Sequence, residues 1–137
     1  AFGVGAGNVA GIVDETADIA AAADRILSST TFDHATSCSS DHSIDVVAAV
    51  RDALLAALRE RGAVMLDAAQ KAKLQQLMWP DGKLSPAVIG QDAGLIAQRA
   101  GLSGLPEDRL RILMVEEDSA AGFGPENPCS GESSARC

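Results

Sequence analysis

The stretch TTFDHATSCSSDHS, residues 30–43, lies where a helical pattern ends and a short run of aliphatic residues begins. It holds one cysteine, Cys38, among small hydroxyl residues, and both histidines of the chain, His34 and His42, lie within four residues of it. Core packing does not explain a cysteine in such polar sequence, and α/β proteins carry reactive groups on loops held by rigid elements. The residues alone leave two interpretations open, a small buried cysteine and a nucleophile.

Composition limits the class of protein. The chain has 137 residues, 47% of them hydrophobic but only 3% aromatic, which predicts one domain with an aliphatic core. A net charge of −8 argues against nucleic acid or an anionic membrane surface as a partner. No apolar run is long enough to cross a bilayer, so we expect no membrane partner. The cysteines, Cys38, Cys129 and Cys137, form neither a CxxC pair nor a disulfide framework, which predicts a reducing, cytoplasmic setting.

Upstream of residues 30–43, the pattern predicts a strand and then a helix. Residues 9–13 are expected to form a short buried strand, and Thr16 is a plausible N-cap with Asp18 in the first helical turn. The apolar face of this helix has the spacing i, i+3, i+4, i+7, i+8 and comprises Ile19, Ala22, Ala23, Ile26 and Leu27.

Downstream, the pattern predicts three helices and further strands. A brief apolar run lies at residues 44–47, and Gly62 is placed to end a helix whose apolar face comprises Val50, Ala53, Leu54, Ala57 and Leu58. Asp67 and Gln70 predict a capping box for a helix that Pro80 stops. A fourth helix is expected over residues 92–100, and a buried strand over residues 110–115. This alternation predicts an α/β fold with a mostly parallel sheet flanked by helices.

Three ordered segments carry a family resemblance. GVGAGN at residues 3–8, DETADIAAAADRI at residues 14–26 and TFDHATSCSSDHS at residues 31–43 together resemble the catalytic domain of CoA-acylating aldehyde dehydrogenases, which include acetylating acetaldehyde dehydrogenase. KLSPAVIGQ at residues 83–91 and FGPENPCSGE at residues 123–132 resemble the same group. The segments ATSCSS and WPDGKLSPA are most similar to those of acylating sulfoacetaldehyde dehydrogenases.

The resemblance implies an oxidoreductase. In this family a cysteine thiolate, here Cys38, attacks a small aldehyde, hydride passes to NAD or NADP, and coenzyme A, the co-substrate, cleaves the resulting thioester. The resemblance also implies that Gly3, Gly5, Gly7 and Asn8 line the pocket near the cysteine, with Gly5, Gly7 and Asn8 as cofactor-binding residues. Glu132 matches a glutamate that helps to hold the nicotinamide ribose. No metal is implied, and the full-length parent is expected to be a homo-oligomer.

Hydrolytic aldehyde dehydrogenases resemble this family but carry a glutamate base in the segment that matches residues 3–8. That stretch holds no carboxylate here, so CoA is the expected acyl acceptor. A hydrolytic, CoA-independent enzyme and a small α/β binding module remain as alternatives. His34 stands where the family has Asn, and we expect it to be a polar loop residue. His42 stands where the family has Gln or Asn, and we expect it to have a structural role. A zinc site would need a fourth ligand.

The end of the chain departs from the family. Residues 1–132 are interpreted as a fragment of the catalytic domain, which alone would be inactive and prone to aggregate. After Glu132 the family continues KLSPVL, whereas this chain has SSARC. Loss of one nucleotide from codons for EKLSPVL yields ESSARC, so we hypothesise that residues 133–137 are an out-of-frame tail. Cys129 stands where the family has Phe, and neither it nor Cys137 is assigned a function.

Overall fold

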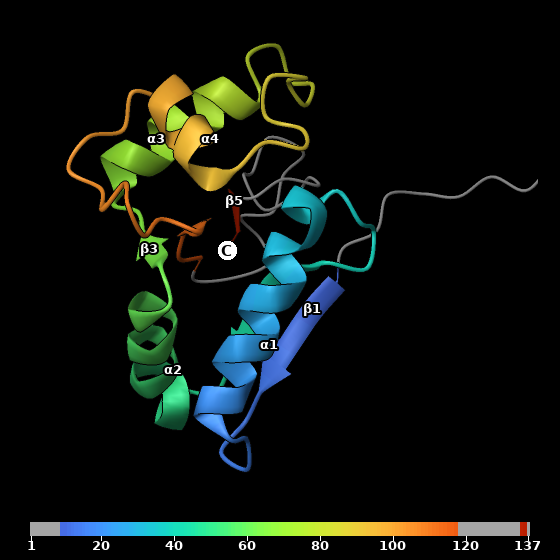
Figure 1. The fold of residues 1–137 in the computed structure, drawn as a ribbon, viewed down its shortest axis with the longest axis vertical. Coiled ribbons are helices and arrows are strands. Elements are labelled where there is room, and N and C mark those ends of the chain that lie inside the picture. The colour runs from blue at the N-terminus through green and yellow to red at the C-terminus, as the bar shows by residue number, and fades with distance from the viewer. Residues whose placement is uncertain (1–8, 118–134, 137) are drawn as a thin grey trace, which may run out of the picture.

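A computed structural model of the chain describes residues 9–117 and 135–136 (Figure 1). Helices and strands alternate as far as α3, as the sequence predicts, and α4 then follows α3 with no strand between them. In chain order they are β1 (Val9–Val13), α1 (Ile19–Thr31), the 3-10 turn η1 (Phe32–Ala35), β2 (Asp41–Val46), α2 (Ala48–Glu60), β3 (Ala63–Met65), α3 (Ala68–Met78), α4 (Ala93–Arg99), β4 (Ile112–Met114) and β5 (Ala135–Arg136).

Every strand pair in the described residues is parallel. β1 pairs with β2, and β4 lies between β3 and β5 in a second, three-stranded sheet. The predicted α/β class with parallel strands and flanking helices is therefore confirmed. Strand β3 was not predicted, because its three residues are too few to show a period that distinguishes a strand from a loop.

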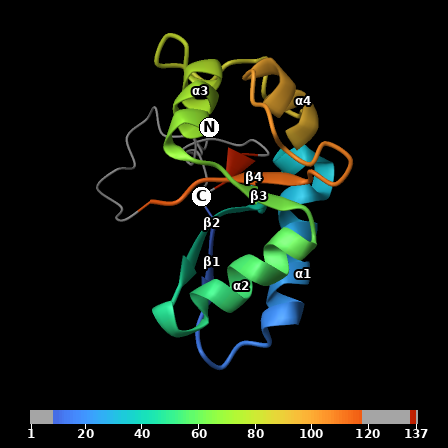
Figure 2. The same cartoon turned by 90° about the vertical axis from the view of Figure 1, so that its left-hand side faces the viewer.

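Strand β4 separates two hydrophobic clusters, and this explains its unbroken apolar sequence. Ile112 and Met114 pack in a cluster with residues of α1 and α2. Leu113 and Val115 pack in another with residues of α3 and α4. Figure 2 shows the same arrangement, with β3 and β4 between α3 and α4 on one side and α1 and α2 on the other.

Truncation of the central strand should be costly. Leu113 is fully buried in β4, so Leu113→Ala leaves a cavity that the surrounding layers cannot close. We expect a loss of about 2–5 kcal/mol in the free energy of unfolding, measured by urea denaturation. Ile12→Ala is the control, because Ile12 is 79% exposed and its truncation should cost less than about 0.5 kcal/mol. Equal losses in the two variants would contradict this account of the core.

The apolar face predicted for α1 is correct, but its N-cap is not Thr16. The side chain of Asp18 accepts from the amide of Ala21 at 3.0 Å and caps the helix. Thr16 instead donates its amide and hydroxyl to Asp14 Oδ1, at 2.9 and 2.7 Å, in a turn before the helix. These bonds lower the pKa of Asp14 by stabilising its carboxylate. The preference of Thr, Asp and Asn for both turns and caps left this choice open in the sequence.

Strand β1 forms as predicted but is not buried throughout. Val13 is buried, whereas Ile12 is 79% exposed. β1 pairs with β2 alone among the described strands, so one edge and one face of it remain uncovered. Strand β2 begins at Asp41, three residues before the apolar run that indicated it.

The remaining helices follow the sequence closely. The capping box of Asp67 and Gln70 is present at the start of α3, and Asp92 caps α4 instead of lying inside it. Leu54 and Leu58 are the buried residues of α2, while Ala53, which was predicted on that face, is exposed. All three helices therefore begin or end within about two residues of the predicted positions.

Candidate active site around Cys38

Cys38 is exposed in a turn between η1 and β2, which we call the Cys38 turn, residues 36–40. Strand β2 begins three residues later at Asp41, which pairs with Val9 at the start of β1. The cysteine therefore lies on a loop, as predicted, at the amino end of these parallel strands. Open α/β sheets more commonly bind ligands at the carboxyl ends of their strands.

A run of left-handed backbone leads from α1 into the Cys38 turn. Asp33, His34 and Ala35 have φ angles of 49°, 50° and 59°. Asp and His are among the residue types that adopt this conformation more readily, but Ala35 is not, and its side chain is fully buried. The turn closes where the amide and hydroxyl of Thr36 donate to the carbonyl of Asp33, at 3.0 and 2.7 Å. The Cys38 turn thus follows directly on a stretch of backbone whose conformation is costly to form.

Serine residues on both sides of Cys38 bond to one another. The hydroxyls of Ser37 and Ser39 lie 2.9 Å apart, and the amide of Ser40 donates to the carbonyl of Ser37 at 3.0 Å. The amide of Asp41 donates to the hydroxyl of Ser29 in α1 at 3.1 Å. The polar composition that drew attention to Cys38 therefore shapes the turn, and it leaves the thiol at the surface.

The two histidines occupy different positions. His42 is buried in β2, and its Nδ1 accepts from the amide of Val9 at 3.4 Å, which joins the starts of the two strands. His34 is exposed in η1 and contributes its backbone to the left-handed run. These positions agree with a structural role for His42 and with a polar loop residue at position 34.

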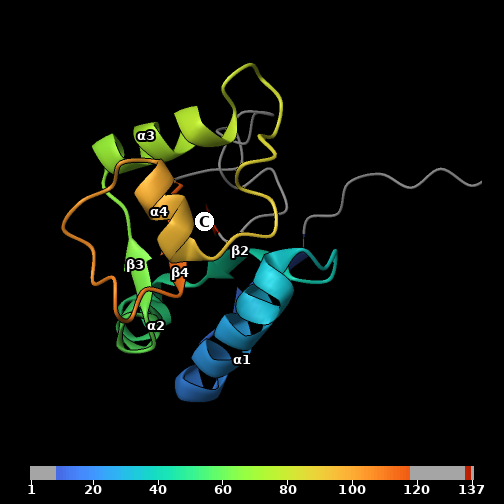
Figure 3. The same cartoon turned by 45° about the horizontal axis from the view of Figure 1, so that its top comes forward.

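The segment before α4 packs against the Cys38 turn. Gly90 has a φ of 64°, and a Cβ atom on it would lie 3.6 Å from Oγ1 of Thr36. The same segment is bonded to both neighbouring helices, because Arg99 donates to the carbonyl of Ala87 and the amide of Ser85 donates to the carbonyl of Met78 at 2.7 Å. Figure 3 shows this segment between α4 and the loop that follows α1. Sequence reasoning missed this contact, which joins positions 54 residues apart.

Several predicted residues lie outside the described part of the chain. They are the glycines and asparagine of the first segment, Gly3, Gly5, Gly7 and Asn8, together with Glu132, Cys129 and Cys137. Within residues 9–117, no three His, Cys, Asp or Glu side chains group to hold a metal ion. None of the helices described is long and apolar enough to span a membrane.

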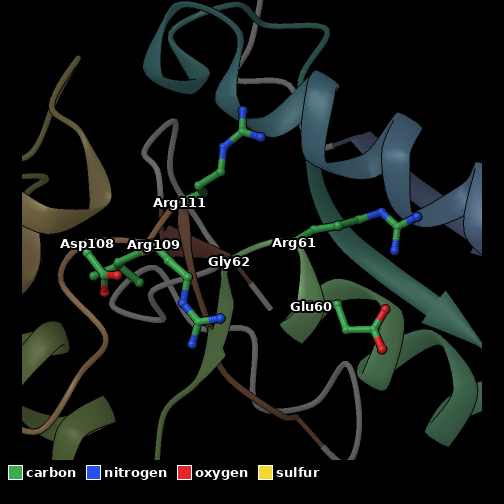
Figure 4. A pocket seen from close by; sticks show the side chains of 7 residues that line it. Glu60, Arg61, Gly62, Asp108, Arg109 and Arg111 are labelled. Atoms are coloured by element: carbon green, nitrogen blue, oxygen red, sulfur yellow. The ribbon is translucent and has the colours of Figure 1, made fainter.

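A hollow of about 310 Å³ lies at the junction of α2, β3 and the segment before β4. Its lining includes Arg61, Arg109 and Arg111 (Figure 4), and these side chains point away from one another. Arg61 donates from Nε to Oδ1 of Asp24 at 2.6 Å, a bond that lowers the pKa of Asp24 and raises that of Arg61. The three guanidinium groups therefore do not converge on one anion.

Comparison with known proteins extends the description. No family model matches the chain. Sulfoacetaldehyde dehydrogenase (acylating) of Cupriavidus necator is 49% identical over 132 residues, which cover 96% of this chain and 26% of the relative. The chain thus spans about a quarter of the length of this relative and of a second acylating sulfoacetaldehyde dehydrogenase.

Solved structures match over almost the whole chain. An acetylating aldehyde dehydrogenase from Geobacillus thermoglucosidasius has a TM-score of 0.88 and 32% identity, over 98% of this chain and 29% of its own. Propionaldehyde dehydrogenase of Rhodopseudomonas palustris, solved with bound CoA and an acylated cysteine, has a TM-score of 0.82 and 26% identity, over 96% and 29%.

An engineered glycolyl-CoA reductase with bound NADP+ has a TM-score of 0.83 and 28% identity, over 98% of this chain and 30% of its own. Solved proteins of this fold therefore include ones that hold NADP+ and ones that hold CoA. The ordered segments, the parallel α/β fold and these similarities agree. The chain belongs to the family of CoA-acylating aldehyde dehydrogenases and spans about a quarter of the length of its sulfoacetaldehyde dehydrogenase relatives.

Proposed function

We propose that this chain carries the nucleophile of an NAD(P)-dependent, CoA-acylating aldehyde dehydrogenase, and that Cys38 is that nucleophile. The observation that carries the proposal is the exposed thiol of Cys38 in a hydrogen-bonded turn, inside the stretch that is 49% identical to an acylating enzyme. A related structure contains an acylated cysteine and CoA, which supports the same chemistry.

The proposed reaction begins at Sγ of Cys38. Its thiolate attacks the aldehyde carbon, a C–S bond forms, and the carbonyl π electrons move to oxygen, where the amide of Cys38 is a candidate donor. The carbonyl then re-forms as hydride leaves the carbon, and bound NAD(P)+ would supply the acceptor for that hydride. The thiolate of CoA attacks the thioester, the bond to Sγ breaks, and the Cys38 thiolate is released. A thiolate suits both steps, because it is a strong nucleophile and a good leaving group.

The cofactor assignments remain predictions for Gly5, Gly7, Asn8 and Glu132. One observation supports those near the amino terminus. Val9, which directly follows Asn8 in the sequence, pairs with Asp41, three residues after Cys38. A glycine-rich segment joined to this strand would allow a close approach of backbone to a cofactor beside the cysteine.

For the substrate we propose a small aldehyde, with sulfoacetaldehyde as the first compound to test, because that aldehyde is named for the 49% identical relative. The divergent arginines of the hollow do not form a sulfonate clamp. The parent is proposed to be a cytoplasmic homo-oligomer. The out-of-frame origin of residues 133–137 would be tested by sequencing the encoding DNA, and an in-frame natural extension would contradict it.

The function can be tested in a chimera. Residues 1–132 would replace the matching stretch of the C. necator relative, and NAD(P)H formation from sulfoacetaldehyde and from acetaldehyde would be followed with and without CoA. We expect turnover that requires CoA and, when CoA is omitted, acyl mass on the Cys38 peptide. Cys129→Ser is the matched control and should retain both. CoA-independent turnover would favour the hydrolytic alternative, and acyl mass elsewhere would overturn the assignment of Cys38.

A further inference from the structure

The carboxyl end of α1 receives its positive charge from a distant residue. Helix α1 has no basic residue in its last turn, although the exposed carbonyls there favour a cation. Nη2 of Arg111, which directly precedes β4, donates to Oγ1 of Thr31 at 3.2 Å. The same hydroxyl donates to the carbonyl of Leu27 at 2.8 Å, so Thr31 links the Arg111 side chain to the helix backbone. Figure 4 shows the Arg111 side chain extending from the hollow toward this helix.

The backbone of Arg111 is itself fixed. Its amide donates to the carbonyl of Gly62 at 2.8 Å. Gly62 has a φ of 96°, and a Cβ atom on it would overlap the carbonyl oxygen of Arg109 and lie 3.1 Å from Cγ of Arg111. Close packing at the α2–β3 junction therefore fixes the backbone position from which the Arg111 side chain extends.

Both ends of the segment that carries Cys38 are attached to the last turn of α1, one through the chain itself and the other through a hydrogen bond. Its start follows directly from Thr31, the residue that Arg111 contacts. Its end is held by Ser29, whose hydroxyl accepts the amide of Asp41. Between them lies the left-handed run at Asp33, His34 and Ala35, whose unfavourable backbone angles need support from their surroundings. A shift at the helix end would therefore displace the Cys38 turn.

We propose that Arg111 is a positioning residue, which fixes the carboxyl end of α1 and through it the turn that carries Cys38. The geometric claim stands on this structure, whereas its catalytic consequence rests on the proposed function. Arg111 acts through Thr31, so its removal should loosen the turn without removing a contact to the substrate.

The test compares Arg111→Met, Arg111→Lys, Thr31→Val and the double variant Arg111→Met/Thr31→Val. Hydrogen exchange of the amides of residues 36–41 is measured in this chain. We expect about a tenfold faster exchange in Arg111→Met, because a hydrogen bond from a charged group restrains local opening, with partial recovery in Arg111→Lys. The double variant should exchange no faster than the faster single variant, since both remove one bond. Arg109→Met is the matched control, because Arg109 lines the same hollow, and it should match the unmodified chain.

Two results would overturn the proposal. One is exchange in Arg111→Met equal to that in Arg109→Met, and the other is additive effects of the two single substitutions. If Arg111→Met fails to fold, the Arg111→Lys and Thr31→Val comparison still decides the matter, because each must accelerate exchange at residues 36–41 more than elsewhere.

The catalytic consequence is measured in the chimera. Arg111→Met should lower kcat with the aldehyde KM unchanged, and it should slow iodoacetamide labelling of Cys38 near neutral pH. A raised KM with unchanged kcat would place Arg111 at the substrate and overturn its positioning role. Faster exchange at residues 36–41 in a chimera that never acylates Cys38 would instead retain the positioning role and reject the proposed function.

Discussion

Replacing Gly62 with alanine should lower the free energy of unfolding by about 3 kcal/mol or more. The φ of 96° disfavours any side chain, which contributes about 1–2 kcal/mol. The added Cβ would also overlap the carbonyl oxygen of Arg109, a backbone atom that cannot rotate away, and such overpacking typically costs a further 1–3 kcal/mol or so. Since domains of this size are stable by only about 5–15 kcal/mol, much of the chain should unfold at modest urea concentrations.

Gly101→Ala provides a control that separates the two causes. Gly101 has a φ of 63°, and a Cβ atom there would have no neighbour within 4 Å. It therefore carries the backbone cost alone, about 1–2 kcal/mol. Urea denaturation of both variants measures the difference. Similar losses would show that the Arg109 carbonyl moves aside, and the close packing at the α2–β3 junction would then not fix Arg111.

Gly62 also shows which features of the fold could be predicted from the sequence and which could not. Its position after an apolar helical face predicted the end of α2 correctly, because that depends on residues within a few positions. The contact with Arg109 joins residues 47 positions apart, and no local pattern carries that information. The same distinction applies to α3, whose capping box is local and was predicted, and to β3, whose identity depends on pairing with β4 and was missed.

The candidate site divides in the same way. The surface turn around Cys38 was predicted from local composition, because small hydroxyl residues favour a turn, and the structure has one. The role of Cys38 as the nucleophile came from the family resemblance and stays a prediction. Three features around Cys38 were not predicted. They are the left-handed backbone before the turn, the close approach of Gly90 to Thr36, and the hydrogen bond from Arg111 to Thr31. The first is a conformation that the surrounding fold imposes, and the other two are tertiary contacts over 54 and 80 residues. Sequence therefore predicted the turn that carries Cys38 but not the contacts that hold this turn.

Removal of the Cys38 thiol should have the largest effect on activity. In the chimera, Cys38→Ala should lower kcat/KM for CoA-dependent oxidation by at least about 10⁴-fold, because no covalent intermediate can form without a nucleophile. The fold should be retained, since Cys38 is exposed and a surface substitution usually changes stability by less than about 0.5 kcal/mol. Activity and urea denaturation measured on the same preparation separate loss of chemistry from loss of structure.

Two further variants define the role of the sulfur atom. Cys38→Ser keeps an oxygen nucleophile at the same position, but a serine hydroxyl stays protonated near neutral pH and its ester releases a poor leaving group to CoA. Its kcat/KM should therefore remain close to that of Cys38→Ala. Ser39→Ala removes the hydroxyl that bonds to Ser37 beside the cysteine, and this control should retain most activity. If Cys38→Ser kept more than a tenth of the activity, the thiolate would not be required, and the role assigned to the sulfur atom would be wrong.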